Sequence, residues 1–132
     1  MLVDSSVWIA FLRGDSLAEV TLLTETMEQE KPVWLAPTIL QEVLQGADNS
    51  DRFTRWDRVL GELPMVIAPD AREAARSAAH LYARCRWAGV TPRSANCLIA
   101  AHAIFASMPL LHRDRDFSLI AGVEPKLMLV AV

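Results

Sequence analysis

Short apolar runs alternate with longer amphipathic segments along most of the chain. The runs lack the apolar–polar alternation of a strand with one solvated face, which is typical of strands buried on both faces. We therefore expect buried strands at 2–4, 32–36, 64–68 and 109–112, and a last edge strand within 126–132.

The segments between these runs repeat apolar residues at helical spacing. They predict helices from residue 5 or 6 onward, over 16–30, 37–46, 50–62 and 70–88, and from residue 94 onward. Residue types suggest the ends: Ser5 or Ser6 and Ser94 as N-caps, Thr38 with Gln41 as a capping box, and Gly46 and Gly89 as stops. The helix after Ser94 is apolar on nearly every side and should be central.

Buried strands separated by helices predict an α/β fold with a parallel sheet covered on both faces. At 132 residues, the chain should form a single domain spanning 1–132. Right-handed crossovers then place strand ends and helix starts at one edge of the sheet, where ligands bind.

The composition, 52% hydrophobic and 22% charged, is that of a compact domain rather than a disordered chain. No apolar stretch is long enough for a membrane span, and Leu2 already begins a strand, so we expect neither a membrane anchor nor a leader peptide. The expected location is the cytoplasm. Cys85 and Cys97 lie in helical apolar patterns without metal-ligand spacing, which predicts reduced core residues.

The net charge of −3 argues against a general polyanion binder, but the charge is unevenly distributed. Residues 76–113 contain five arginines and no acidic residue, and eleven of the 13 basic residues are arginine. Arginine suits bidentate phosphate contact, although a solvated basic helix face explains the pattern equally well.

Polar residues follow the predicted strands at the edge where ligands are expected. Asp4 follows the first strand, Glu42 lies one turn into the helix after the second, and Asn96 lies in the first turn of the central helix. Asp114 and Asp116 follow the fourth strand, within the sequence "LLHRDRDFSLI". Four carboxylates on one rim repel one another unless a divalent cation neutralises them.

The chemistry that fits such a cluster is metal-dependent phosphodiester cleavage. Mg²⁺ and Mn²⁺ prefer oxygen ligands, and two such ions about 3.5–4 Å apart can activate water and stabilise the leaving oxygen. Arg93, Arg113 and Arg115 lie beside the acidic residues and are expected to hold the phosphate backbone of the substrate.

Each of these residues also has a local explanation. Asp4 can cap a helix, Glu42 can be an exposed helix residue, and Asp114 with Asp116 can form a capped turn. Ser6 either supports a metal ligand or caps a helix. Two histidines and four tryptophans are expected at core or interface positions rather than in the site: His102, His112, Trp8, Trp34, Trp56 and Trp87.

Four blocks, "VDSSVWIAFL", "PTILQEVLQG", "TPRSANCLIAAHAI" and "LLHRDRDFSLIA", together resemble the PIN-domain toxins of VapC type. The resemblance covers essentially the whole chain. It implies a three-layer α/β/α fold with a central parallel sheet of four to five short strands. It also implies a toxin of a type II toxin–antitoxin system, an Mg²⁺- or Mn²⁺-dependent endoribonuclease that cleaves RNA such as tRNA or ribosomal RNA loops.

The resemblance also implies partners and site residues. The partners are a second copy of the chain and a VapB-type antitoxin whose tail covers the active-site groove, in a heterotetramer or larger assembly. From that groove we expect an antitoxin arginine or lysine to enter the acidic pocket. The implied acidic residues are Asp4, Glu42, Asp114 and Asp116, with Ser6 as the small hydroxyl residue.

Asn96 departs from the family pattern, which usually has aspartate at this position. An asparagine can ligate a cation through its carbonyl oxygen, but it lacks the charge and cannot act as a base. Activity should therefore be lower, whether Asn96 is a natural impairment or an introduced Asp→Asn change; the intact pattern around it favours the second.

Two other functions fit parts of the sequence. A non-catalytic RNA- or antitoxin-binding module, decayed at Asn96, would bind these partners without cleaving RNA. A receiver-like signalling domain would need a phospho-acceptor such as Asp70 and a lysine after the last strand, but Lys126 precedes that strand.

Overall fold

A parallel pair of strands, β1 (Leu2–Val3) and β2 (Leu110–Leu111), lies at the centre of the fold, which the computed structural model describes over residues 1–132. Leu2 pairs with Leu110 and Val3 with Leu111. The Asp4 N–H continues the ladder by donating to the Leu111 carbonyl at 2.9 Å. The two strands are joined by over a hundred residues of chain, so this long-range pairing organises the molecule.

Three single parallel bridges extend this pair: Leu2 with Trp34, Leu35 with Met65, and Leu110 with Leu129. The predicted α/β class with a parallel sheet is thus confirmed, but four to five regular strands are not, because only two segments form strands. Prolines bound or begin the others, at 32, 37, 64 and 125. Proline has no N–H to donate, which shortens a hydrogen-bonded ladder.

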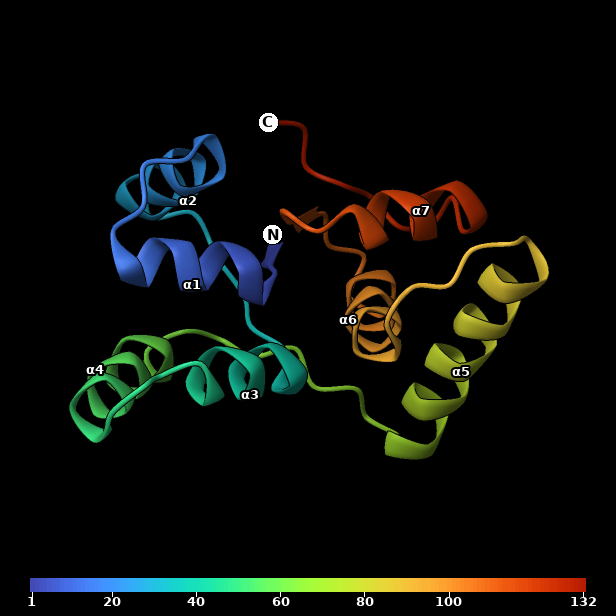
Figure 1. Cartoon of the computed structure of the whole chain (residues 1–132), viewed down its shortest axis with the longest axis horizontal. Coiled ribbons are helices and arrows are strands. Elements are labelled where there is room, and N and C mark those ends of the chain that lie inside the picture. The colour runs from blue at the N-terminus through green and yellow to red at the C-terminus, as the bar shows by residue number, and fades with distance from the viewer.

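Helices lie on both sides of the parallel segments (Figure 1). On one side are the helices of the first half of the chain, α1 (Ser5–Arg13), α2 (Ala18–Glu28), α3 (Pro37–Gln45) and α4 (Ser50–Gly61). On the other are α5 (Ala71–Trp87), α6 (Ser94–Phe105) and α7 (Arg115–Val123). No helix is both long and apolar enough to cross a membrane.

The order of the parallel segments places a topological switch between β1 and β2. From β1 the chain adds segments outward on one side through Trp34 and Met65, and then returns to add β2 and Leu129 on the other. In parallel α/β folds, ligands bind outside the carboxyl ends of the strands at such a switch. Asp4 and Asp114 follow β1 and β2 at this point.

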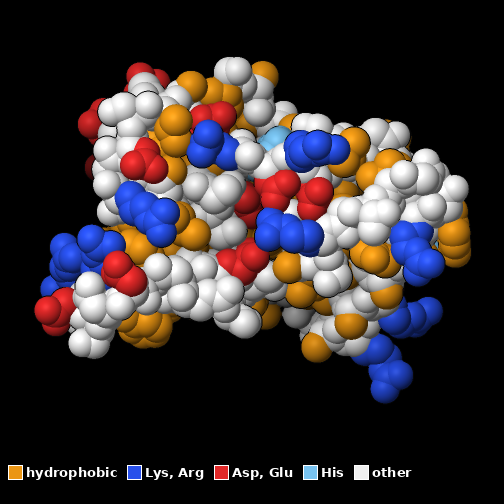
Figure 2. Space-filling view, viewed as in Figure 1, with side chains coloured by type: hydrophobic (Ala, Val, Ile, Leu, Met, Phe, Trp, Pro, Cys, Tyr) orange, Lys and Arg blue, Asp and Glu red, His pale blue; other side chains and the backbone are white.

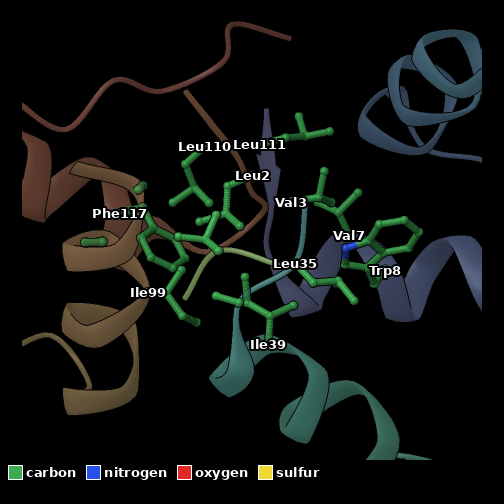
Figure 3. Close-up of a cluster of buried hydrophobic side chains, with 14 of the residues drawn as sticks. Leu2, Val3, Val7, Trp8, Leu35, Ile39, Ile99, Leu110, Leu111 and Phe117 are labelled. Carbon is green, nitrogen blue, oxygen red and sulfur yellow. The ribbon is translucent and has the colours of Figure 1, made fainter. Parts of the chain in front are cut away.

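The hydrophobic core joins the sheet to helices on both sides (Figure 3). The side chains of Leu2 and Leu110 are fully buried in the sheet, while Ile39 of α3, Ile99 of α6 and Phe117 of α7 reach them from the helices. The expectation that the helix after Ser94 is central is confirmed, since α6 buries residues around most of its circumference.

The predicted helix N-caps were wrong at three places. α1 is capped by Asp4 rather than Ser5 or Ser6. α6 is capped by Arg93, without a side-chain hydrogen bond, so Ser94 lies inside the helix. α3 starts after Ala36 with a proline at its first position and no capping box. Composition alone could not locate these starts, because a pre-set proline φ or a strand exit begins a helix equally well.

α7 was not predicted as a helix. A capped turn was only the local alternative for Asp114 and Asp116, and the Asp114 side chain instead caps a nine-residue helix by accepting from the Asp116 N–H at 3.0 Å. The predicted ends hold better: α3 ends at Gly46, and Gly89, just after α5, adopts φ +83°, a left-handed conformation that favours glycine.

The core predictions for cysteine and histidine agree with the structure. Cys85 and Cys97 are buried and unpaired, and burial raises the pKa of the Cys97 thiol to about 11. The His102 ring lies 2.8 Å from the Leu98 carbonyl, and His112 packs edge-on against Phe117.

The tryptophans have more varied environments than the sequence suggested. Trp8 and Trp56 are buried and Trp34 is half-buried. Trp87, in contrast, is 76% exposed at the end of α5, so it is not a core residue of this chain.

We expect Leu110→Ala to lower the free energy of unfolding by about 2–5 kcal/mol, because it leaves a cavity where the sheet meets both helical layers. Leu119→Ala, the same change on the exposed side of α7, should cost less than about 1 kcal/mol. Urea denaturation measures both. Equal losses of unfolding free energy in the two variants would show that the packing of Leu110 at the β1/β2 pair is not central to the core.

Candidate functional site

Asp4 is held at the start of α1, directly after β1. Its Oδ2 accepts hydrogen bonds from the Ser6 N–H at 3.2 Å and the Ser6 hydroxyl at 2.6 Å. The residue is only 2% exposed. A carboxylate at a helix N-terminus is favoured by capping and by the helix dipole, so the local fold orients Asp4 before any ligand is considered.

Ser5 connects Asp4 to Glu42. The Ser5 hydroxyl lies 3.2 Å from Glu42 Oε1 and 3.5 Å from Asp4 Oδ1, so it bridges α1 and α3. Glu42 was predicted from the sequence as a site residue, whereas Ser5 was considered only as a helix cap; the position of Ser5 next to Asp4 was the only available signal. Packing of α1 against α3 is what makes the two carboxylates neighbours.

Asp114 and Asp116 form a second carboxylate pair, against the start of α6. The Asn96 amide Nδ2 donates to Oδ2 of each aspartate, at 3.0 Å in both cases. Asn96 is 1% exposed and lies in the first turn of α6. Asn96 thus links the two carboxylates through hydrogen bonds from one neutral group.

Arg93 adds a positive charge to this second pair. Its guanidinium Nη2 donates to Asp114 Oδ2 at 2.6 Å, and its backbone N–H donates to Asp116 Oδ2 at 2.9 Å. The guanidinium Nε lies 3.9 Å from the same Asp116 oxygen. A predicted RNA-binding arginine is therefore in direct contact with two predicted metal ligands.

The other two predicted RNA-binding arginines have different surroundings. The Arg113 backbone N–H donates to the Ser6 hydroxyl at 3.3 Å, which connects β2 to the Asp4 pair, while the Arg113 side chain pairs with Glu19 at 3.5 Å. Arg115 is exposed and forms no ion pair. Of these three arginines, only Arg93 contacts the acidic cluster through its side chain.

The two pairs interact electrostatically. Burial raises the pKa of Asp4, the Ser6 hydrogen bonds oppose this, and the nearby Asp114 charge raises it further. Burial also raises the pKa of Glu42, with Asp4 and Asp114 adding to the rise and Ser5 and Arg93 opposing it. The carboxylates of the two pairs are therefore close enough for each charge to disfavour ionisation of the others, as the sequence predicts.

Asp114 behaves differently. Burial alone would raise its pKa, but hydrogen bonds from the Asp116 N–H, Arg93 and Asn96 outweigh burial and lower it. The site therefore combines one buried carboxyl that resists ionisation with one that is stabilised as an anion.

The structure brings together all the predicted acidic residues, Asn96 and Ser6. In Figure 2, acidic side chains meet near the middle of the visible face, with basic side chains on both sides. Asp70 is not part of the cluster, because it is exposed and caps α5. The roles of the clustered residues in binding and catalysis stay predictions.

An open groove of about 970 Å³ extends from Glu42 between α3 and α5, over α6. Figure 1 shows these two helices on either side of α6. The walls are mostly small apolar residues, chiefly alanines of α5, and Ile67 at the edge is 68% exposed. The groove is thus a mainly apolar surface that includes Glu42, the residue that Ser5 connects to Asp4.

The donor set is compatible with a hard divalent cation. No group of three or more His, Cys, Asp or Glu side chains is arranged to hold a metal by itself. Mg²⁺, however, commonly takes only one or two carboxylates and keeps several waters. Asp4 Oδ1, whose nearest donor is Ser5 at 3.5 Å, and the Asp114 carboxylate supply such oxygens.

Known proteins resemble this chain in sequence. Residues 1–123 match the PIN domain family. The chain is 36% identical over 125 residues to VapC ribonuclease Mb1587 of Mycobacterium bovis, with 93% of this chain and 92% of that protein covered. Ribonuclease VapC11 of Mycobacterium tuberculosis H37Rv has the same identity and coverage.

Solved structures agree on the fold. The crystal structure of VapBC2 from Rickettsia felis bound to a DNA fragment from their promoter superposes with a TM-score of 0.76 at 17% identity, covering 98% of this chain and 96% of that chain. VapBC-5 from Mycobacterium tuberculosis gives 0.67 at 23% identity, covering 99% and 97%. Family match, relatives and fold agree, and the chain therefore belongs to the PIN-domain family, as a relative of the VapC ribonucleases.

Proposed function

We propose that this protein is the toxin of a type II toxin–antitoxin system and acts as an Mg²⁺- or Mn²⁺-dependent endoribonuclease. The observation that carries the proposal is the meeting of Asp4 and Glu42 with Asp114 and Asp116 at the β1/β2 switch. The VapC ribonucleases that cover nearly the whole chain support the same activity.

Asp4, Asp114, Asp116 and the amide oxygen of Asn96 would hold the cation. Bound there, the metal would supply Lewis-acid stabilisation of the cleaved phosphodiester and a more acidic water. For Asn96 to act as a ligand its amide must turn, since its nitrogen faces the aspartates in the present arrangement. Asn96 therefore positions the aspartate pair by hydrogen bonding unless a cation reorients it.

The remaining residues position the acidic groups and the substrate. Ser5 and Ser6 orient the Asp4 and Glu42 carboxylates. Glu42, with its raised pKa and partial exposure, is suited to hold or transfer a proton at the edge of the groove. Arg93, Arg113 and Arg115 would contact RNA phosphates, because guanidinium groups bind phosphate oxygens bidentately.

The substrate we propose is a single-stranded RNA loop, as in tRNA or ribosomal RNA. The location we propose for the enzyme is the cytoplasm, where these RNAs act. Unstacked nucleotides can enter a recessed site that a regular duplex cannot. The positively charged side chains around the cluster would attract the backbone, and the acidic pocket would admit it only together with a cation.

The partner we propose is a VapB-type antitoxin, bound to a toxin homodimer in a heterotetramer or larger assembly. Its tail would lie in the apolar groove between α3 and α5 and place an arginine or lysine against Glu42 and Asp4. The Rickettsia felis and Mycobacterium tuberculosis structures of the same fold are themselves VapBC complexes, which supports this assignment.

One observation favours a second function, a PIN module that binds RNA or antitoxin without cleaving. Asn96 donates to both aspartates and so stabilises them without a cation. An aspartate at 96 would instead add a third negative charge and increase the need for a metal. The two functions differ in whether restoring that aspartate restores cleavage.

Asn96→Asp should increase Mg²⁺- or Mn²⁺-dependent cleavage of a tRNA and rRNA pool by about 10–100-fold, the scale on which residues around a metal affect activity. Adding Asp4→Asn in the same protein should abolish the gain. Gel analysis of the cleaved RNA measures both. Unchanged, negligible cleavage by a folded Asn96→Asp protein that binds Mn²⁺ would favour the non-catalytic module.

Asp4→Asn should increase the free energy of unfolding at pH 7 in EDTA. The folded pKa of Asp4 is raised, so ionisation destabilises the native state. Below the unfolded pKa of about 3.9 the carboxyl is protonated in both states and this penalty is absent; it grows as the pH rises through the folded pKa. Thermal unfolding from pH 3 to 8 should therefore show the advantage appearing with rising pH.

The control for that experiment is Asp57→Asn, the same change on an exposed position of α4, which should alter stability little at any pH. Asparagine remains a good N-cap, so the change at position 4 keeps the helix start. A less stable Asp4→Asn protein at pH 7 would mean that hydrogen bonding from Ser6, rather than carboxylate repulsion, dominates at this position.

Glu42→Gln should weaken binding of the antitoxin by about tenfold, the effect of losing one charge-assisted hydrogen bond. Glu28→Gln, an exposed change on α2, is the matched control. Isothermal titration calorimetry with the purified antitoxin gives both affinities. Equal affinities for the two variants would argue against a basic side chain at Glu42.

A further inference from the structure

Arg93 donates to the same carboxylates that are proposed to bind the metal. Its guanidinium lies 2.6 Å from Asp114 Oδ2 and its Nε 3.9 Å from Asp116 Oδ2. We propose that Arg93 is a built-in counter-ion of the acidic cluster, which competes with the divalent cation for these two aspartates and so weakens metal binding. This inference rests on the proposed metal site, and goes beyond it by assigning a chain-encoded control of its affinity.

Competition follows from the way the aspartate oxygens are used. Asp114 Oδ2 accepts from both Arg93 and Asn96, and Asp116 Oδ2 accepts from the Arg93 N–H and Asn96. Mg²⁺ binds oxygen at about 2.0–2.1 Å, so at either carboxylate it would lie close to the positively charged guanidinium, whichever carboxylate oxygen it took. Two cations at one carboxylate repel, so binding of the metal and of the guanidinium must be mutually unfavourable.

The backbone around Arg93 is fixed, while its side chain is free to move. The carbonyl of Arg93 accepts from the Asn96 and Cys97 N–H groups at the start of α6, and its own N–H is bound to Asp116. The side chain, in contrast, is 69% exposed. Leaving Asp114 would therefore disturb no core packing.

Space for the displaced guanidinium is present beside the site. A hollow of about 530 Å³ is lined by Arg93, both aspartates, Arg115 and the 89–91 turn. A guanidinium that moves into it stays next to the carboxylates and becomes available to an RNA phosphate. Metal binding would thus convert Arg93 from an internal counter-ion into a substrate contact.

Arg115 provides a matched control for the charge of Arg93. It lies between the two aspartates in sequence and lines the same hollow, but it forms no ion pair. Arg93→Met and Arg115→Met remove the same charge from the same neighbourhood, and only the first removes contacts to the carboxylates. Arg93→Lys keeps the charge but loses the planar fork.

The experiment is titration calorimetry of the purified chain with MnCl₂ at constant ionic strength, after thermal unfolding has shown that each variant is folded. We expect Arg93→Met to bind Mn²⁺ about five- to tenfold more tightly than the unmodified chain, Arg115→Met within about twofold of it, and Arg93→Lys in between. In ¹⁵N NMR, the Arg93 Nε–H resonance should move on addition of Mg²⁺, while that of Arg115 should move less.

The outcomes separate this inference from the proposed function. Mn²⁺ binding of equal strength in the unmodified chain, Arg93→Met and Arg115→Met would overturn the role of Arg93 and leave the metal site intact. Equal tightening by Arg93→Met and Arg115→Met would also overturn it, because general electrostatics would then suffice. No Mn²⁺ binding by any variant, with Asn96→Asp included, would overturn the metal site itself and the inference with it.

Discussion

Repulsion among carboxylates at the β1/β2 switch is the constraint on which the site depends. The parallel pairing of Leu2 with Leu110 places the chain segments that carry Asp4 and Asp114 next to each other, and burial deprives Asp4 of water. The resulting carboxylate arrangement does not stabilise the fold, because a buried carboxylate beside another negative charge is unfavourable. A fold that keeps such an arrangement is suited to bind a cation, as we propose for this site.

Hydrogen-bond donors from α1 and from the start of α6 offset part of that repulsion. From α1, Ser5 and Ser6 donate hydrogen bonds to Glu42 and Asp4. From the start of α6, Asn96 and the N-cap residue Arg93 donate hydrogen bonds to the Asp114 pair. The result is asymmetric, since the pKa of Asp4 is raised and that of Asp114 is lowered. At the Asp4 pair, loss of the negative charge is favourable. At the Asp114 pair, hydrogen bonds from the protein already stabilise the negative charge.

The apolar groove and the acidic cluster meet at Glu42, so one surface can serve two ligands. RNA would approach the carboxylates with a cation, whereas a peptide in the groove could bring its own positive charge. Arg93 is a third source of positive charge, supplied by the chain itself. The proposed metal, the proposed partner and the internal arginine would all neutralise the same negative charge, so each would weaken the binding of the others.

The sequence by itself determined the parallel α/β class, the central position of α6 and the residues of the acidic cluster. These follow from local features: unbroken apolar runs, helical periodicity, and carboxylates placed at strand exits. The tertiary structure alone decided which groups touch: the Ser5 bridge to Glu42, the cap at Asp4, the α7 helix and the contact of Arg93 with Asp114. Such contacts join residues far apart in sequence or compete with equally good local alternatives, and only packing of the helices on the sheet selects among them.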